Sequence, residues 1–98
     1  TMNPEPAETK NGYWMPNVIV DGEVNFSREA LLSDFKKEGI DGRVFFWPLS
    51  MLPMFEDLPG NKVSYSLYHR GINLPTYHDL ADEEMDLVVK VLSRHINK

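Results

Sequence analysis

The chain has 98 residues, of which 42% are hydrophobic and 26% are charged, as in one ordinary globular domain. Its net charge of −5 and dispersed lysine and arginine residues argue against nucleic-acid binding, which usually needs a basic patch. The absence of cysteine excludes disulfides and thiolate metal sites, no apolar run approaches the ~20 residues of a membrane-spanning helix, and we expect a cytoplasmic protein.

The first twelve residues are polar, contain Pro4 and Pro6, and show no apolar periodicity. We therefore expect residues 1–12 to form an arm or linker and residues 13–98 to form the folded domain. Aromatic and β-branched residues over 13–20 predict a first strand. Because Pro16 cannot donate to a neighbouring strand, it should lie at a bulge or on a sheet edge.

A helix is predicted next, from about residue 27 to residue 38. Ser27 is a suitable N-cap, since its hydroxyl can accept a hydrogen bond from a free amide of the first turn. Gly39 can adopt the left-handed conformation that ends many helices. The buried face is predicted from apolar residues at helical spacing, which are Leu31, Leu32 and Phe35.

The middle of the chain predicts a second strand at 43–47, ending at Pro48. The three aromatic residues of this strand suggest that both of its faces are covered. The loop at 49–60 carries many apolar residues, which a purely solvated loop would not. We expect it to be ordered and to pack on another part of this domain or beyond it.

A short helix is expected at 61–70, with Asn61 as its cap and with Val63 and Leu67 facing inward. Residues 72–75 should be extended, because the residue before a proline avoids the helical region.

The last helix, at 82–95, starts with acidic and ends with basic residues, as the helix dipole favours. We expect His95 to be an exposed residue at its end. The predicted order β-α-β-loop-α-α indicates an α/β (α+β) domain with a short sheet packed by about three helices. The residues expected on the buried face of the last helix are Met85, Val88, Val89, Leu92 and Ile96.

No pattern in this sequence supports catalysis by the chain alone. The three histidines lack the spacing of metal ligands, the glycines are isolated and form no phosphate-binding loop, and no nucleophile lies in a recognisable strand-to-helix turn. We expect neither a catalytic residue nor a metal site here.

Four segments, taken in order, resemble the DegT/StrS family of sugar-nucleotide aminotransferases. They are 11–16 (NGYWMP), 39–50 (GIDGRVFFWPLS), 70–76 (RGINLPT) and 80–85 (LADEEM). Each segment alone is weak, but four in the family's order and spacing are specific. The resemblance covers about residues 11–96 and is nearest to the perosamine-synthase-like branch.

The resemblance implies the small C-terminal domain of an aspartate-aminotransferase-like fold (fold type I). In this family a large N-terminal domain binds pyridoxal phosphate, and the small domain closes over the active site. The family transfers an amino group from glutamate to a nucleotide-linked keto sugar and acts as a homodimer. No lysine of this chain lies in the context of the family's Schiff-base lysine. We therefore expect cofactor-binding residues only in the N-terminal domain of a longer parent chain.

The sequence departs from the family pattern at the start of the last helix. Ala81 stands where a threonine commonly caps this helix, so that Asp79 or Asp82 would have to cap it instead.

An alternative function for the chain is a free-standing binding or regulatory module derived from this domain.

The segment at 43–50 holds the first candidates for contact with a nucleotide-sugar substrate. Arg43 could bind a carboxylate or phosphate through two parallel hydrogen bonds, or pair with a carboxylate of its own chain. Phe45 and Trp47 could stack on a base or a sugar, or could belong to the core. Ser50 takes the place of a polar residue near the sugar in relatives, although its hydroxyl could also form a turn.

Asn11 and Tyr13 complete the candidate substrate-binding residues. They could contact the substrate or the other subunit, or serve only to lead into the first strand.

Overall fold

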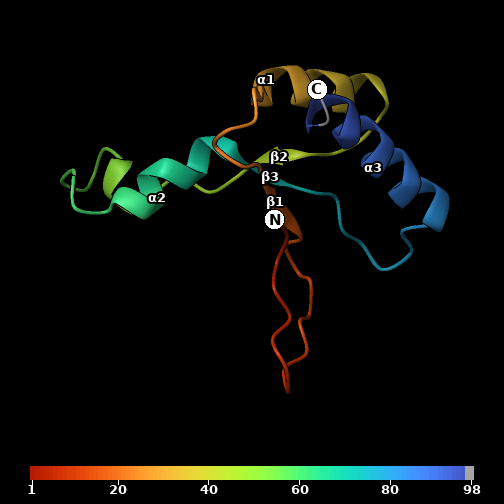
Figure 1. Ribbon diagram of the computed structural model, residues 1–98, viewed down its shortest axis with the longest axis horizontal. Coiled ribbons are helices and arrows are strands. Elements are labelled where there is room, and N and C mark those ends of the chain that lie inside the picture. The colour runs from red at the N-terminus through yellow and green to blue at the C-terminus, as the bar shows by residue number, and fades with distance from the viewer. Residues whose placement is uncertain (97–98) are drawn as a thin grey trace.

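The computed structural model describes residues 1–96 and contains a small sheet with two long helices on one side of it (Figure 1). The three-stranded antiparallel sheet and the three helices confirm the predicted α+β class, in the order β-α-β-α-β-α. The elements are β1 (Asn17–Ile19), α1 (Arg28–Lys37), β2 (Arg43–Val44), the 3-10 turn η1 (Leu49–Met51), α2 (Lys62–Leu67), the 3-10 turn η2 (Tyr68–Arg70), β3 (Gly71–Asn73) and α3 (Asp82–Ile96).

The last strand in the chain, β3, lies at the centre of the sheet, in the order β1-β3-β2. Ile72 pairs with Val18 on one side and with Val44 on the other. The sequence predicts only extended backbone at 72–75, and the structure makes its first residues the central strand. Three residues are too few for strand periodicity to be visible in the sequence.

The core lies between the sheet and the two helices α1 and α3. Ile72 is 0% exposed, and Leu31 and Phe35 of α1 are also fully buried, as predicted, while Leu32 is partly buried. Burial of each such side chain contributes about 1.5–3 kcal/mol to the stability of the fold. The complete buried apolar set is Val18, Val20, Leu31, Phe35, Ile72, Val88, Val91 and Leu92.

Local signals at the ends of α1 were predicted correctly. The Ser27 hydroxyl accepts a hydrogen bond from the Ala30 amide at 3.2 Å, and Gly39 has a φ of 72°. At the start of α3, the Glu84 carboxylate accepts from the Ala81 amide at 2.9 Å. This is the returning half of a capping box, in which a carboxylate of the first turn bonds the N-cap amide, so it differs from the side-chain cap expected of Asp79 or Asp82.

The buried face of α3 differs from the predicted one. Met85 and Val89 are exposed, whereas Val91 and His95 are buried. The stripe that faces the core is therefore rotated by about one residue, and it places a histidine at the position where the helix ends. The prediction that His95 is exposed was wrong, because the side chain is 7% exposed and bonds to α1.

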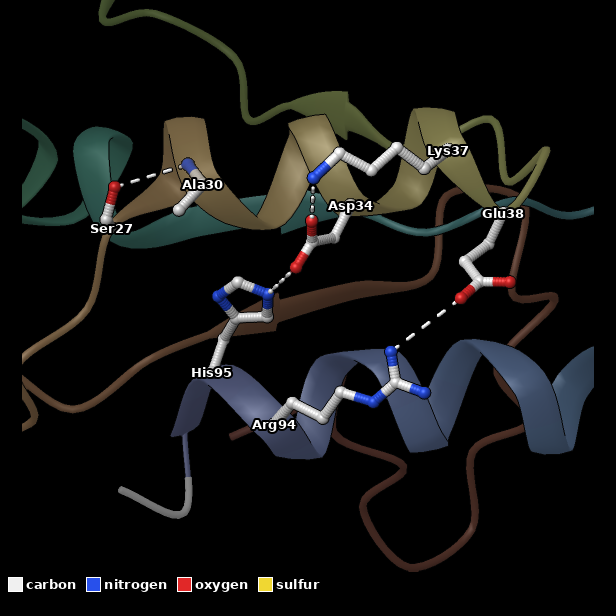
Figure 2. Close-up of polar contacts among 7 residues, drawn as sticks. All are labelled: Ser27, Ala30, Asp34, Lys37, Glu38, Arg94 and His95. Atoms are coloured by element: carbon white, nitrogen blue, oxygen red, sulfur yellow. Dashed lines mark hydrogen bonds and ion pairs between the residues drawn. The ribbon is translucent and has the colours of Figure 1, made fainter.

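Figure 2 shows how polar groups join α1 to α3. The Nε2 atom of His95 lies 3.0 Å from Oδ2 of Asp34, whose other oxygen is 2.8 Å from the Lys37 ammonium group. The hydrogen bonds from Lys37 and then His95 hold the pKa of Asp34 below its ordinary value. A second, longer contact of 3.7 Å joins Arg94 to Glu38.

Two predicted strands are shorter in the structure, and one residue expected to face inward is exposed. The first strand starts at Asn17 and not at Tyr13. The left-handed φ of 46° at Tyr13 is incompatible with an extended strand at that residue. The second strand ends at Val44, and Phe46 and Trp47 are exposed, so the expected cover on both faces was wrong. In α2, Leu67 is partly buried, but Val63 is 71% exposed because α2 lies away from the helices that cover the sheet (Figure 1).

Asn61 does lie at the N-cap position of α2, but its side chain makes no capping hydrogen bond. Within residues 1–96, no helix has both the length and the apolar character to cross a membrane.

The N-terminal residues form a long excursion that returns to the sheet (Figure 1). Met2 makes an isolated antiparallel bridge to Val18, and the Thr1 carbonyl accepts from the Ile19 amide at 2.8 Å. The Asn3 carboxamide oxygen accepts from the Asn17 amide at 2.7 Å. These contacts extend the β1 edge of the sheet, and Pro16 directly precedes this edge strand and does not lie within it.

We predict that Gly42→Ala destabilises the fold by about 1–3 kcal/mol through overpacking. A methyl group at Gly42 would lie 2.7 Å from Cε2 of the fully buried Phe35 ring. The control is Gly60→Ala, where the methyl group meets no atom within 4 Å. Urea unfolding of both variants measures the difference, and equal unfolding free energies would contradict the predicted clash.

We predict that stability falls in acid partly through Asp34. Because the folded state lowers the pKa of this carboxyl below its ordinary value, its contribution to stability is complete at any pH above that ordinary value. The contribution is lost as the pH falls through the folded pKa, since the unfolded chain binds the proton first. Asp34→Asn should flatten the acid limb of a stability–pH curve, and Asp86→Asn, on the exposed surface of α3, should leave it steep.

Candidate functional site

Residues 45–70, called here the 45–70 lobe, lie beside the sheet and are fastened to the rest of the domain at three points. The Arg28 guanidinium donates to the Tyr68 carbonyl at 2.8 Å, and the Arg70 guanidinium donates to the Val20 carbonyl. Phe45 packs directly on Gly71 of β3, where a methyl group would lie 2.6 Å from Cβ of Phe45. The lobe therefore starts and ends in contact with the buried part of the domain.

A hydrogen-bonded group of four side chains, called here the Ser50 cluster, holds the loop of this lobe against α2. It consists of Ser50, Asp57, Asn61 and Tyr65. The hydroxyl oxygens of Ser50 and Tyr65 are 2.6 Å apart, and Ser50 is only 9% exposed. The cluster explains why the loop is ordered: its polar atoms are paired across 15 residues of sequence.

Two adjoining surface pockets share Ser50 and Phe55 in their walls, with volumes of ≈ 530 and ≈ 580 Å³. Tyr65 and Tyr68 line the first, and Asn61 lines the second. These volumes are in the ~300–1,000 Å³ range of small-molecule sites. A mostly apolar wall with a few convergent hydroxyl groups suits recognition of a small polar ligand.

Two of the candidate aromatic residues have different settings in the lobe. Trp47 is 49% exposed, and its ring centroid lies 5.0 Å from that of Tyr68, which also lines the first Ser50 pocket. Phe45 is half-buried against Gly71. Trp47 is thus available to a ligand beside the pocket, whereas Phe45 fixes the lobe to the sheet.

Arg43 does not line either Ser50 pocket. Its guanidinium group makes two hydrogen bonds to the Asp41 carboxylate, at 2.9 and 3.3 Å. This pairing raises the pKa of Arg43 and lowers the pKa of Asp41. Both side chains are largely exposed, so an anionic group of a ligand could displace the Asp41 carboxylate from Arg43.

The structure places Asn11 and Tyr13 in the N-terminal excursion. The Asn11 carboxamide oxygen accepts from the Tyr13 amide at 2.7 Å, and the Thr76 hydroxyl donates to the Tyr13 carbonyl at 3.5 Å. Tyr13 lines a separate pocket of ≈ 280 Å³ with Met85. The candidates therefore occupy three places: this excursion, the β2 edge at Arg43, and the 45–70 lobe.

Sequence reasoning missed Asp57, Tyr65 and Tyr68, and it treated Asn61 only as a helix cap. The apolar content of the loop indicated that it packs, but no motif marked which polar residues it packs with.

We predict that Tyr65→Phe loosens the loop, because the Leu58 amide donates to the Tyr65 hydroxyl oxygen at 3.0 Å. Loss of one hydrogen bond of about 0.5–1.5 kcal/mol should speed exchange of this amide by about 2- to 10-fold. Amide hydrogen exchange by NMR measures the effect. Tyr77→Phe, which removes a hydroxyl bonded to Glu84, is the matched control and should leave Leu58 unchanged.

Comparison with known proteins identifies the family to which this chain belongs. The model of the DegT/DnrJ/EryC1/StrS aminotransferase family matches residues 1–93. A GDP-perosamine synthase of Vibrio cholerae is 33% identical over 92 residues, which are 91% of this chain and 25% of that protein. The GDP-perosamine synthase of Caulobacter vibrioides is 26% identical over 84 residues, covering 84% of this chain and 23% of its own length.

A third GDP-perosamine synthase, from Escherichia coli O157:H7, is 28% identical over 82 residues, covering 83% of this chain and 22% of its own length. The chain thus spans about a quarter of the length of these curated relatives and matches their C-terminal part. Because the family model matches almost the whole chain, this protein belongs to the DegT/DnrJ/EryC1/StrS aminotransferase family.

Proposed function

We propose that residues 13–98 are the small C-terminal domain of a pyridoxal-phosphate-dependent aminotransferase, preceded by an arm or linker at 1–12. The parent enzyme transfers an amino group from glutamate to a nucleotide-linked keto sugar in the cytoplasm. The observation that supports this proposal is the family match over residues 1–93, together with three relatives named GDP-perosamine synthase. A GDP-linked sugar is therefore the first substrate to test.

The cofactor of this family does not fit the residues of this chain. A Schiff base forms on a lysine that an enclosed site holds in place and activates. The lysines that the structure describes are all exposed, and Lys37 is engaged with Asp34. We derive no catalytic step from this chain and assign pyridoxal phosphate to the N-terminal domain of the parent.

The exposed apolar side chains of the 45–70 lobe support a docking role. Large contiguous apolar patches are uncommon on isolated soluble domains and mark interaction sites. We propose that this surface packs on the N-terminal domain of the same parent chain, within a homodimer, so that the lobe closes over the active site. Its exposed large apolar residues include Phe46, Trp47, Leu49, Met54, Phe55, Leu58 and Val63.

The test of this proposal is the size of the native product in the source cell, measured with an antibody against this chain. We expect a band several times heavier than the 11.3 kDa of these residues. The purified heavier protein should then show cofactor absorbance and should aminate a GDP-linked keto sugar. A band at 11.3 kDa would contradict the proposal and leave a free-standing binding or regulatory module.

A further inference from the structure

The direction of the hydrogen bonds in the Ser50 cluster follows from counting protons around Tyr65. Its hydroxyl oxygen has three polar neighbours: Asp57 Oδ1 at 2.5 Å, Ser50 Oγ at 2.6 Å and the Leu58 amide at 3.0 Å. An ionised carboxylate can only accept, and a backbone amide can only donate. The single proton of Tyr65 therefore goes to Asp57, and Tyr65 accepts from Leu58 and from Ser50.

This assignment leaves Ser50 without a free proton. Its hydroxyl donates to Tyr65, and the Asn61 carboxamide nitrogen lies 3.5 Å away as a donor to Ser50. The bonds thus run in one direction, from Asn61 through Ser50 and Tyr65 to the Asp57 carboxylate. Successive hydrogen bonds polarise one another, so the remaining lone pair of Ser50 is a strengthened acceptor.

The walls of the two pockets beside Ser50 favour the same kind of ligand group. Asp57 lines the first pocket and Glu56 the second, and no lysine or arginine is among the described residues that line either. An acidic pocket disfavours phosphate and carboxylate oxygens. Phe55, Tyr68 and Met51 give the first pocket an apolar surface on which the C–H face of a sugar can pack.

We propose that Tyr65 is a positioning residue that fixes Ser50 as an acceptor, so that the pocket selects a hydroxyl group of the sugar. The choice of a sugar as the ligand rests on the proposed function. The diphosphate of a nucleotide sugar is then bound outside these two pockets. In the recognition of this hydroxyl group, Tyr65 acts through Ser50, and Ser50 accepts the ligand's proton in a hydrogen bond.

The polarity of the cluster is tested on the 98-residue chain by neutron diffraction of crystals exchanged into heavy water. We expect the deuterium of Ser50 to point at Tyr65 and the deuterium of Tyr65 to point at Asp57. In Tyr65→Phe, the Ser50 deuterium should turn away from residue 65. A Tyr65 deuterium that points at Ser50 in the unaltered protein would overturn the inference.

The ligand is tested on the parent enzyme with GDP-perosamine and with analogues in which each sugar hydroxyl is replaced by fluorine. Fluorine cannot donate, so one analogue should bind about 10- to 100-fold more weakly, since a buried acceptor then loses its partner. In Ser50→Ala this penalty should shrink to within about threefold. In Tyr65→Phe it should also shrink, because Ser50 regains a proton that it can direct at the ligand.

The two possible failures give different results. If the unaltered parent binds neither GDP-perosamine nor its analogues and transfers no amino group, the proposed function and the sugar ligand fall together. If the parent binds GDP-perosamine but every analogue shows the same penalty in the unaltered enzyme and in Ser50→Ala, only the present inference is overturned. Tyr77→Phe, which removes a hydroxyl bonded to Glu84, should leave all ratios unchanged.

Discussion

The burial of Ile72 is the contact on which the rest of this domain depends. β3 has three residues and its neighbours have three and two, and sheets this small need a covered face to be stable. Ile72 supplies the centre of that face, between Val18 and Val44 and beneath the buried residues of α1 and α3. A slip of one residue would turn Gly71 or Asn73 toward the helices, so the burial also fixes the register.

A second constraint is that two aromatic rings pack closely against glycine backbone, one in the core and one where the 45–70 lobe begins. Gly42 leaves room for the Phe35 ring in the core, and Gly71 leaves room for Phe45 where the 45–70 lobe begins. Between α1 and α3, Asp34 compensates the burial of His95 with a hydrogen bond at 3.0 Å. The helices are thus joined by an apolar seam and by two polar contacts, His95 with Asp34 and Arg94 with Glu38.

The features predicted well from sequence are those whose causes are local. The Ser27 cap, the left-handed Gly39 and the buried pair Leu31 and Phe35 each depend on neighbours within about one helical turn. The central position of β3 and the burial of His95 depend on partners far away in sequence, and neither strand length nor helical spacing encodes them. His95 also breaks the rule that a terminal basic residue is exposed, because Asp34 meets it from another helix.

The same division applies to the candidate site. Ser50 was chosen from the sequence because a resembling segment contains it, but its partners Asp57 and Tyr65 lie 7 and 15 residues further on. The loop between them follows no repeating pattern, so that its path had to come from the structure. Arg43, Tyr13 and Ser50 all lie in segments that resemble the family, but they occupy different places in the structure. A sequence motif gives the order of residues along the chain and not the distances between them in space.

The 45–70 lobe has no buried apolar side chain, whereas the buried apolar residues of the core lie in β1, β3, α1 and α3 and at Val20, directly after β1. Hydrogen bonds and stacked rings hold it instead, and such regions open at a smaller free energy than a packed core does. The domain therefore combines a tightly packed layer of sheet and helices with a lobe of lower local stability. A partner that binds the 45–70 lobe can change the conformation of the lobe while the packed layer stays folded.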